Sequence, residues 1–288
     1  MRLDGQRESG NIEDRRSMGP AVAGGGGLLV VVAIVLSLVF GIDPRQLLQL
    51  GQQIGVQREA EIAPGQEDEQ EVELRQFVSK VLATTEDVWK QQFPALVGKP
   101  YQDTTLVLFR NGVDSACGQA SSAVGPFYCP RDMKVYLDLA FFDEMRTKFR
   151  APGDFACAYV VAHEVGHHVQ NLLGLSDKVT AAQARAGEVE GKHLSVRLEL
   201  QADFLAGVWA HHAQKTKQIL EAGDIAEAIN AAQAIGDDTL QRQSTGRVVP
   251  DAFTHGTSKQ RIKWFTHGLK TGNLEDLDLL FKTPYEEL

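Results

Sequence analysis

The stretch that decides the fold runs from Asp154 to Gly174 and reads DFACAYVVAHEVGHHVQNLLG. Pro152 and Gly153 break the chain just before it. Asp154 suits the N-cap of a helix, and Gly174 ends the apolar pattern. We therefore predict one buried helix over Phe155–Leu173.

This helix carries His163, Glu164 and His167 in the pattern HEVGH. Side chains four residues apart share one helix face, so both imidazoles can bind one zinc ion, with Glu164 beside a fourth, water-occupied position. The alternative is a surface helix with two hydrated histidines. The flanking FACAYVVA and VQNLL are too apolar for that, and burying these polar groups without partners is costly. His168 points about 100° away around the helix and is not expected to be a ligand.

A hydrolytic zinc site needs three protein ligands and one open position. The best source of the third ligand is RLELQADFLAG, in which Glu199 and Asp203 lie one turn apart on an otherwise apolar helix. We expect Glu199 to be the ligand and Asp203 to accept the second N–H of a ligand histidine. The alternative is a surface pair that faces Arg197 or Lys192.

The rest of the chain predicts few strands and many helices. A helical pattern begins near Glu71 and ends before Pro94. Thr104–Phe109 indicates a buried strand, and Lys134–Leu139 an amphipathic strand at a sheet edge. From Phe141 onward the pattern is mostly helical. The expected fold is therefore α+β, with a helix-rich domain and a small β-sheet.

One apolar stretch, residues 21–42, contains no charged residue and is long enough to cross a bilayer core of about 30 Å. We expect one transmembrane helix there, with a cleaved signal peptide as the alternative. Residues 1–20 would form an N-terminal leader, 43–70 a linker rich in Gln, Gly and acidic residues, and 71–288 the catalytic domain.

The basic residues around the apolar stretch predict its orientation. Four arginines precede it and only two follow within the next twenty residues: Arg2, Arg7, Arg15 and Arg16, then Arg45 and Arg58. This bias places the N-terminus in the cytoplasm and the catalytic domain in the periplasm or outside the cell. An exported domain would allow Cys117 and Cys129 to form a disulfide, while Cys157 lies in an apolar run and is expected to be buried.

Composition narrows the class of protein. The chain has 288 residues, 43% of them hydrophobic, which is typical of a globular protein. A net charge of -9 argues against nucleic-acid binding, which needs a basic face. A mean hydropathy of -0.20 excludes a membrane protein with many spans.

Several segments together make the chain resemble the neutral zinc metallopeptidase family of bacterial single-span membrane proteins. These are HEVGHHVQ, ELQADFLAGVWA, the N-terminal MRLDGQRESGNIEDRRS and the central GPFYCPRDMKVYLDLAFF. The resemblance covers Met1 to about Gly268. It implies a zincin fold of the gluzincin type, with the HExxH helix, a second helix carrying a glutamate ligand, and a small sheet whose edge strand borders the cleft.

By that resemblance His163, His167 and Glu199 are ligands of Zn²⁺ and Glu164 is the general base. THGTSKQRI, residues 254–262, is similar to a stretch of membrane-associated zincins in which a histidine faces the oxyanion and an arginine follows. Carried over, His255 stabilises the oxyanion and Arg261 supports the site. The alternative is a loop histidine and a surface arginine.

The expected function is that of a membrane-anchored zinc metalloprotease. Zinc activates water, Glu164 takes its proton, and an extended peptide adds to the strand Lys134–Leu139. A membrane-anchored binding or assembly protein with structural zinc is the alternative. Structural sites, however, are usually closed by four protein ligands, often including cysteine, and have no use for Glu164.

Overall fold

The computed structural model describes residues 1–16, 69–121 and 124–288. The expected membrane stretch 21–42 and most of the expected linker 43–70 lie outside the described residues. Within the described ranges, no helix has the length and apolar character needed to cross a membrane.

The main sheet has four strands in the order β1-β2-β6-β5. Neighbours β1, β2 and β6 run parallel, and β5 is antiparallel to β6. The four strands are β1 (Ile12–Asp14), β2 (Thr105–Phe109), β5 (Phe127–Cys129) and β6 (Lys134–Asp138). A separate hairpin pairs β3 (Gly112–Ser115) with β4 (Gly118–Ser121).

The expectation that Lys134–Leu139 forms a sheet edge is wrong. β6 lies between β2 and β5, and the edge strand on this side is β5. Tyr136 and Asp138, the polar positions of the amphipathic pattern, are as buried as the apolar ones. The reason is that Phe127 stacks on the Tyr136 ring and the Asp138 carboxylate accepts backbone N–H groups, so the second face of β6 is also covered.

Residues 1–16, expected to form a leader apart from the domain, belong to its fold. β1 adds to the sheet beside β2, with Ile12 opposite Leu106 and Asp14 opposite Leu108. Nearer the terminus, Leu3 is buried in the core. The N-terminal segment is thus the outer strand of the sheet on the side away from β5.

Helices make up most of the remaining chain, as expected for a helix-rich α+β protein. They are α3 (Glu69–Val97), α4 (Ala140–Thr147), α5 (Asp154–Leu172), α6 (Leu175–Gln183), α7 (Glu188–Lys217), α8 (Asp224–Ala234), α9 (Asp237–Thr245), α10 (Ser258–Thr271) and α11 (Leu279–Lys282). Short 3₁₀ turns span Pro250–Ala252, Leu274–Asp278 and Tyr285–Glu287.

The helix expected from Glu71 to just before Pro94 is one turn longer than its sequence suggests. α3 continues through Pro94 to Val97. Pro94 cannot donate to the Lys90 carbonyl and its ring crowds that carbonyl, which interrupts the hydrogen-bond ladder there without ending the helix. Gly98 N–H then donates to the Pro94 carbonyl at 2.8 Å and closes the last turn.

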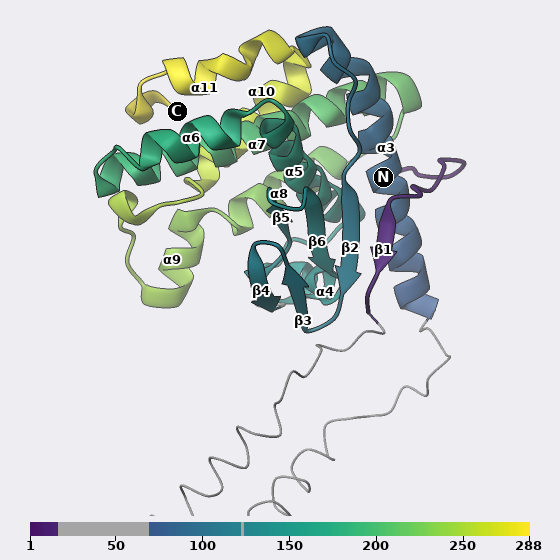
Figure 1. Cartoon of the computed structure of the whole chain (residues 1–288). Coiled ribbons are helices and arrows are strands. Elements are labelled where there is room, and N and C mark those ends of the chain that lie inside the picture. The colour runs from purple at the N-terminus through teal and green to yellow at the C-terminus, as the bar shows by residue number, and fades with distance from the viewer. Residues whose placement is uncertain (17–68, 122–123) are drawn as a thin grey trace, which may run out of the picture.

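Helix α5 occupies the centre of the molecule. It packs against α3, α7 and α8 and touches strands β5 and β6. Figure 1 shows the sheet beside α3, with α6, α7, α10 and α11 gathered on the other side of α5. Phe155 of α5 lies in the hydrophobic core of the molecule, where its ring stacks on Trp209 of α7.

Helices α7 and α10 approach each other closely because two glycines face the contact. A Cβ on Gly207 would lie 2.1 Å from the Phe265 carbonyl oxygen, and one on Gly268 would lie 2.1 Å from the Phe204 oxygen. Side chains at these positions would hold the helices apart. The glycines therefore let α10 bring its residues directly against α7.

Candidate metal centre

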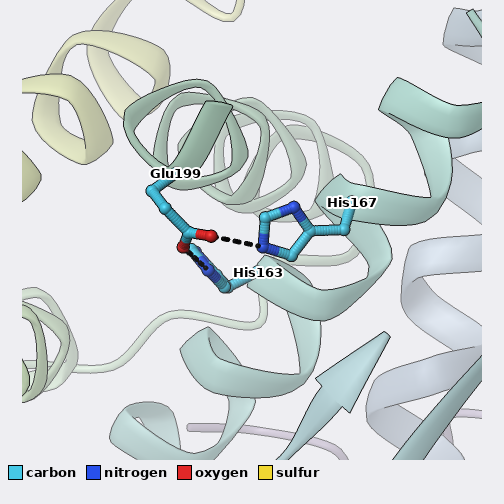
Figure 2. A group of neighbouring side chains, drawn as sticks. All are labelled: His163, His167 and Glu199. Atoms are coloured by element: carbon cyan, nitrogen blue, oxygen red, sulfur yellow. Dashed lines mark hydrogen bonds and ion pairs between the residues drawn. The ribbon is translucent and has the colours of Figure 1, made fainter. Parts of the chain in front are cut away.

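Two helices bring three metal-ligating side chains to one point. His163 and His167 come from successive turns of α5, and Glu199 comes from α7 (Figure 2). One ligand atom from each lies within 4.8 Å of the others. The Glu199 carboxylate is 3.2 Å from His163 Nε2 and 3.5 Å from His167 Nε2.

The other ring nitrogen of each histidine is already engaged. His163 Nδ1–H donates to Asp203 Oδ1 at 2.8 Å, and His167 Nδ1–H donates to Gln170 Oε1 at 2.9 Å. Gln170 is itself fixed, because its amide donates to the Leu198 carbonyl at 2.7 Å. These bonds keep a proton on Nδ1 of each histidine and turn both Nε2 atoms toward Glu199.

Asp203, expected to accept the second N–H of a ligand histidine, is fully buried and accepts from His163 Nδ1. Arg261 of α10 donates to both of its oxygens, from Nε at 2.8 Å and from Nη2 at 3.0 Å, and Tyr159 donates its hydroxyl at 2.5 Å. Burial alone would raise the pKa of Asp203, but Arg261 and His163 outweigh it and hold the pKa at about 2. Asp203 is therefore a permanent negative charge behind His163.

Charge interactions dominate the protonation of the three converging side chains. Burial lowers the pKa of His163, but Asp203 and the hydrogen bond to Glu199 overcome it and raise the pKa to about 9. The pKa of His167 is raised in the same way by Glu199. Burial raises the pKa of Glu199, but the two histidines hold it well below its usual value.

This donor set fits zinc. Two imidazole nitrogens with fixed tautomers and one carboxylate match the three protein ligands of hydrolytic zinc sites. Each histidine also has the outer hydrogen-bond partner that such ligands require. The surroundings favour positive charge at the point where the three side chains meet, which a divalent cation supplies.

A cleft of about 710 Å³ opens above this point. Glu164 lines it, 8% exposed, and within the described residues its carboxylate makes no hydrogen bond or ion pair. The edge strand β5 forms one wall through Phe127 and Tyr128. An unpaired carboxylate therefore lines the cleft next to the candidate metal ligands.

His255 also lines the cleft, and its partner Asp237 was missed by sequence reasoning. Asp237, at the start of α9, accepts from His255 Nδ1 at 3.1 Å and from the backbone N–H groups of Thr254 and His255 at 2.7 Å. The hydrogen bond to Asp237 raises the pKa of His255. In sequence, the DD pair after Gly236 is a helix-start signal, but nothing there indicates a distant histidine.

Comparison with known proteins gives the family. The family model described as "Putative neutral zinc metallopeptidase" matches residues 1–280. The protein named "Uncharacterized protein YpfJ" from Escherichia coli K12 is 50% identical over 283 residues, which cover 95% of this chain and 96% of that one. "Uncharacterized protein Rv2575" from Mycobacterium tuberculosis H37Rv is 42% identical over 255 residues, 82% of each chain.

The chain belongs to this family. The family name gives zinc as the metal, in agreement with the donor set. No solved structure matches the chain. Because the relatives carry no described activity, the roles of individual residues in this family member rest on its own geometry.

Another feature of the site, missed in sequence, is the attachment of β5 to α5. His168, next to the candidate ligand His167, is fully buried and is not part of the ligand cluster. Its Nε2–H donates to the Gln102 carbonyl at 2.7 Å, and its Nδ1 accepts from the Tyr128 hydroxyl at 3.0 Å. Asn171 Nδ2 donates to the same hydroxyl at 3.0 Å. Two residues of α5 therefore hold the wall of the cleft.

The cysteines lie where the sequence suggested. Cys117 and Cys129 form a disulfide that joins the end of β5 to the β3–β4 hairpin. Cys157 is buried in α5, and burial raises the pKa of its thiol to about 12. The thiol is therefore protonated and unreactive at neutral pH.

Proposed function

We propose that the chain is a zinc-dependent peptidase whose ligands are His163, His167 and Glu199. The observation that carries this proposal is their convergence at the floor of a cleft that Glu164 also lines. When bound, zinc lowers the pKa of water and polarises a carbonyl group. A site built only to hold the metal would not need an open cleft beside an unpaired carboxylate.

Glu164 is the general base in this proposal. Its carboxylate takes a proton from the attacking water and returns it to the nitrogen of the departing amine. The lack of a competing hydrogen bond from described residues leaves both oxygens available for this transfer. Its low exposure keeps the carboxylate away from bulk water, where the proton would exchange.

His255 would contact the substrate directly, whereas Arg261 would act through Asp203. His255, oriented by Asp237 and lining the cleft, would donate a hydrogen bond to the carbonyl oxygen as negative charge develops there. Arg261 also lines the cleft, but its side chain is only 3% exposed and its guanidinium binds Asp203. It therefore supports His163 through Asp203.

The substrate class that suits the cleft is an extended peptide. Among the described residues β5 pairs with β6 along one side only, so its other side could accept a further strand. Backbone hydrogen bonds would then hold the peptide across the ligands, with Phe127 and Phe149 offering apolar contact. Recognition through the backbone predicts broad side-chain tolerance.

Membrane attachment through residues 21–42 is a proposal from the sequence, since these residues lie outside the described ranges. The disulfide between Cys117 and Cys129 favours a domain located outside the reducing cytoplasm.

The deciding experiment compares Glu164→Gln with wild type in the full chain, using casein and a quenched fluorescent peptide as substrates. Glutamine keeps the size of the side chain but cannot take the proton, so cleavage should fall at least about a hundredfold. Zinc content should stay at the wild-type level, because Glu164 is not among the three ligands. Glu275→Gln, on an exposed turn that does not line the cleft, is the matched control.

Zinc-loaded Glu164→Gln that cleaves at the wild-type rate would overturn this mechanism. Wild-type protein that holds zinc and cleaves neither substrate would favour the binding or assembly protein instead.

A further inference from the structure

The N-terminal segment is built into the fold by its backbone. Leu106 N–H donates to the Asn11 carbonyl at 2.9 Å, and Arg15 N–H donates to the Leu108 carbonyl at 2.8 Å. Further back along the chain, Arg2 N–H donates to the Ile219 carbonyl at 2.8 Å. These bonds connect the segment to the sheet at one end and to the loop after α7 at the other.

A buried carboxylate depends on the same segment. Glu86 of α3 is 2% exposed. It accepts from the Ser9 hydroxyl and from Asn11 Nδ2 at 2.8 Å, and it pairs with Arg7 at 2.7 Å. Among the described residues, these are all of its hydrogen-bond and ion-pair partners. Without residues 7–11 a buried charge would be left unpaired, which is strongly destabilising.

The four arginines from which the membrane orientation was predicted form ion pairs inside this folded unit. Each has an acidic partner there: Arg2 with Glu221, Arg7 with Glu86, Arg15 with Glu13, and Arg16 with Glu71. The bias of basic residues applies to short loops that flank a span. Residues folded into a domain are not such a loop, so the four arginines do not report on the membrane.

The described residues on either side of residues 17–68 also meet. Arg16 Nη1 lies 3.0 Å from the Glu71 carboxylate, so the chain leaves the fold and re-enters it at one edge. Figure 1 shows β1 ending close to the start of α3 at this edge. A single bilayer crossing between residues 16 and 69 would separate these residues by about 30 Å of hydrocarbon. Residues in direct contact cannot be separated in that way.

We propose that residues 1–16 and 69–288 lie on the same side of the cytoplasmic membrane. This arrangement replaces the expected one, in which a single transmembrane helix leaves the N-terminus in the cytoplasm and the catalytic domain outside. The proposal rests on the packing of the N-terminal segment and is independent of the peptidase activity.

Labelling of two introduced cysteines in the full chain tests the proposal. Glu8→Cys reports on the N-terminal segment and Lys270→Cys on the end of α10. Both positions are exposed, and neither side chain makes a hydrogen bond or ion pair with a described residue. Intact spheroplasts are treated with a membrane-impermeant maleimide, and a second sample is treated after lysis. Wild type gives the background, since Cys117 and Cys129 are joined and Cys157 is buried.

The proposal expects both variants to show the same labelled fraction in intact spheroplasts, either both labelled or both protected until lysis. Labelling of both variants would also support the proposed exported domain, and protection of both would contradict that location. Either result supports the proposal that the two parts lie on the same side. Labelling of Lys270→Cys with protection of Glu8→Cys, or the reverse, would overturn it.

Discussion

Glu199 is the residue that joins α7 to the two histidines of α5, so zinc binding should depend on it. Removing an outer hydrogen-bond partner of a ligand weakens metal binding by about 10–100-fold, and removing a ligand should exceed that range. We expect Glu199→Ala to lose zinc in a chelator titration, while Glu190→Ala, on the exposed start of the same helix, keeps it. Unchanged affinity in Glu199→Ala would assign the third ligand to another residue.

The hydrogen bond between Asp237 and His255 predicts a shift in pH dependence. The pKa of His255 is raised, first by this hydrogen bond, with Glu199 also raising it and Arg261 lowering it. If the imidazolium form stabilises the oxyanion, kcat/KM falls as pH rises through the raised pKa. Asp237→Asn should therefore move the alkaline limb of the profile to lower pH.

The measurement is kcat/KM against pH for wild type and Asp237→Asn at saturating zinc. His255→Ala should lower the plateau and abolish this limb. An alkaline limb that persists unchanged in His255→Ala would assign the ionisation to another group.

At the scale of elements, the distance between α5 and α7 sets the geometry of the ligands. A Cβ on Gly166 would lie 3.0 Å from the Ala202 carbonyl oxygen and 3.1 Å from its Cα. We expect Gly166→Ala to push the helices apart and to weaken both zinc affinity and thermal stability. Gly191→Ala is the control, because a Cβ there meets nothing within 4 Å.

In Gly191→Ala the gain in helix propensity should stabilise the protein by about 0.5–1 kcal/mol. Equal melting temperatures for the two variants would show that the helices tolerate the added methyl group.

The attachment of β5 to α5 predicts an effect on substrate binding. Tyr128→Phe removes the hydroxyl that His168 and Asn171 bind, a loss of about 0.5–1.5 kcal/mol for each hydrogen bond. Because β5 would hold the peptide and not the reacting atoms, KM should rise several-fold while kcat changes little. Steady-state kinetics separates the two, and a fall in kcat alone would speak against β5 as the peptide-binding strand.

At the scale of the whole molecule, the N-terminal strand should contribute to stability. The parallel register places the Glu13 N–H opposite the Leu106 carbonyl, so Glu13→Pro removes this bond. Glu13→Ala loses the same contacts to Lys134 and Arg15 but keeps the N–H. We expect the proline variant to be less stable than the alanine variant by about 1–3 kcal/mol.

Urea unfolding of the full chain, followed by the fluorescence of the buried Trp89, Trp209 and Trp264, measures this difference. Identical unfolding midpoints for the two variants would mean that β1 adds nothing to the fold.

The sequence could predict the parts of the site that depend on helical spacing. The helix expected over Phe155–Leu173 is observed as Asp154–Leu172, and the i, i+4 rule placed His163 with His167 and Glu199 with Asp203. The order of the strands could not be predicted from the sequence, because β5 has three residues and no detectable pattern. For the same reason β6 was expected at the edge.

Contacts between segments far apart in the chain could not be predicted from the sequence either. The pairing of Asp237 with His255 and of Glu86 with Ser9 depends on tertiary structure, which local periodicity does not encode. The N-terminal residues mix acidic and basic side chains without a period, so their place in the sheet left no local signal.

The contact between Arg16 and Glu71 also governs how the folded part of this protein can be prepared without residues 17–68. A chain cut ahead of Glu69 would lack β1 and leave Glu86 unpaired, so it should misfold or aggregate. Excising residues 17–68 and closing the gap with a short glycine-serine bridge keeps every described element. Since an ion pair already holds the two ends together, closing so short a loop costs little entropy.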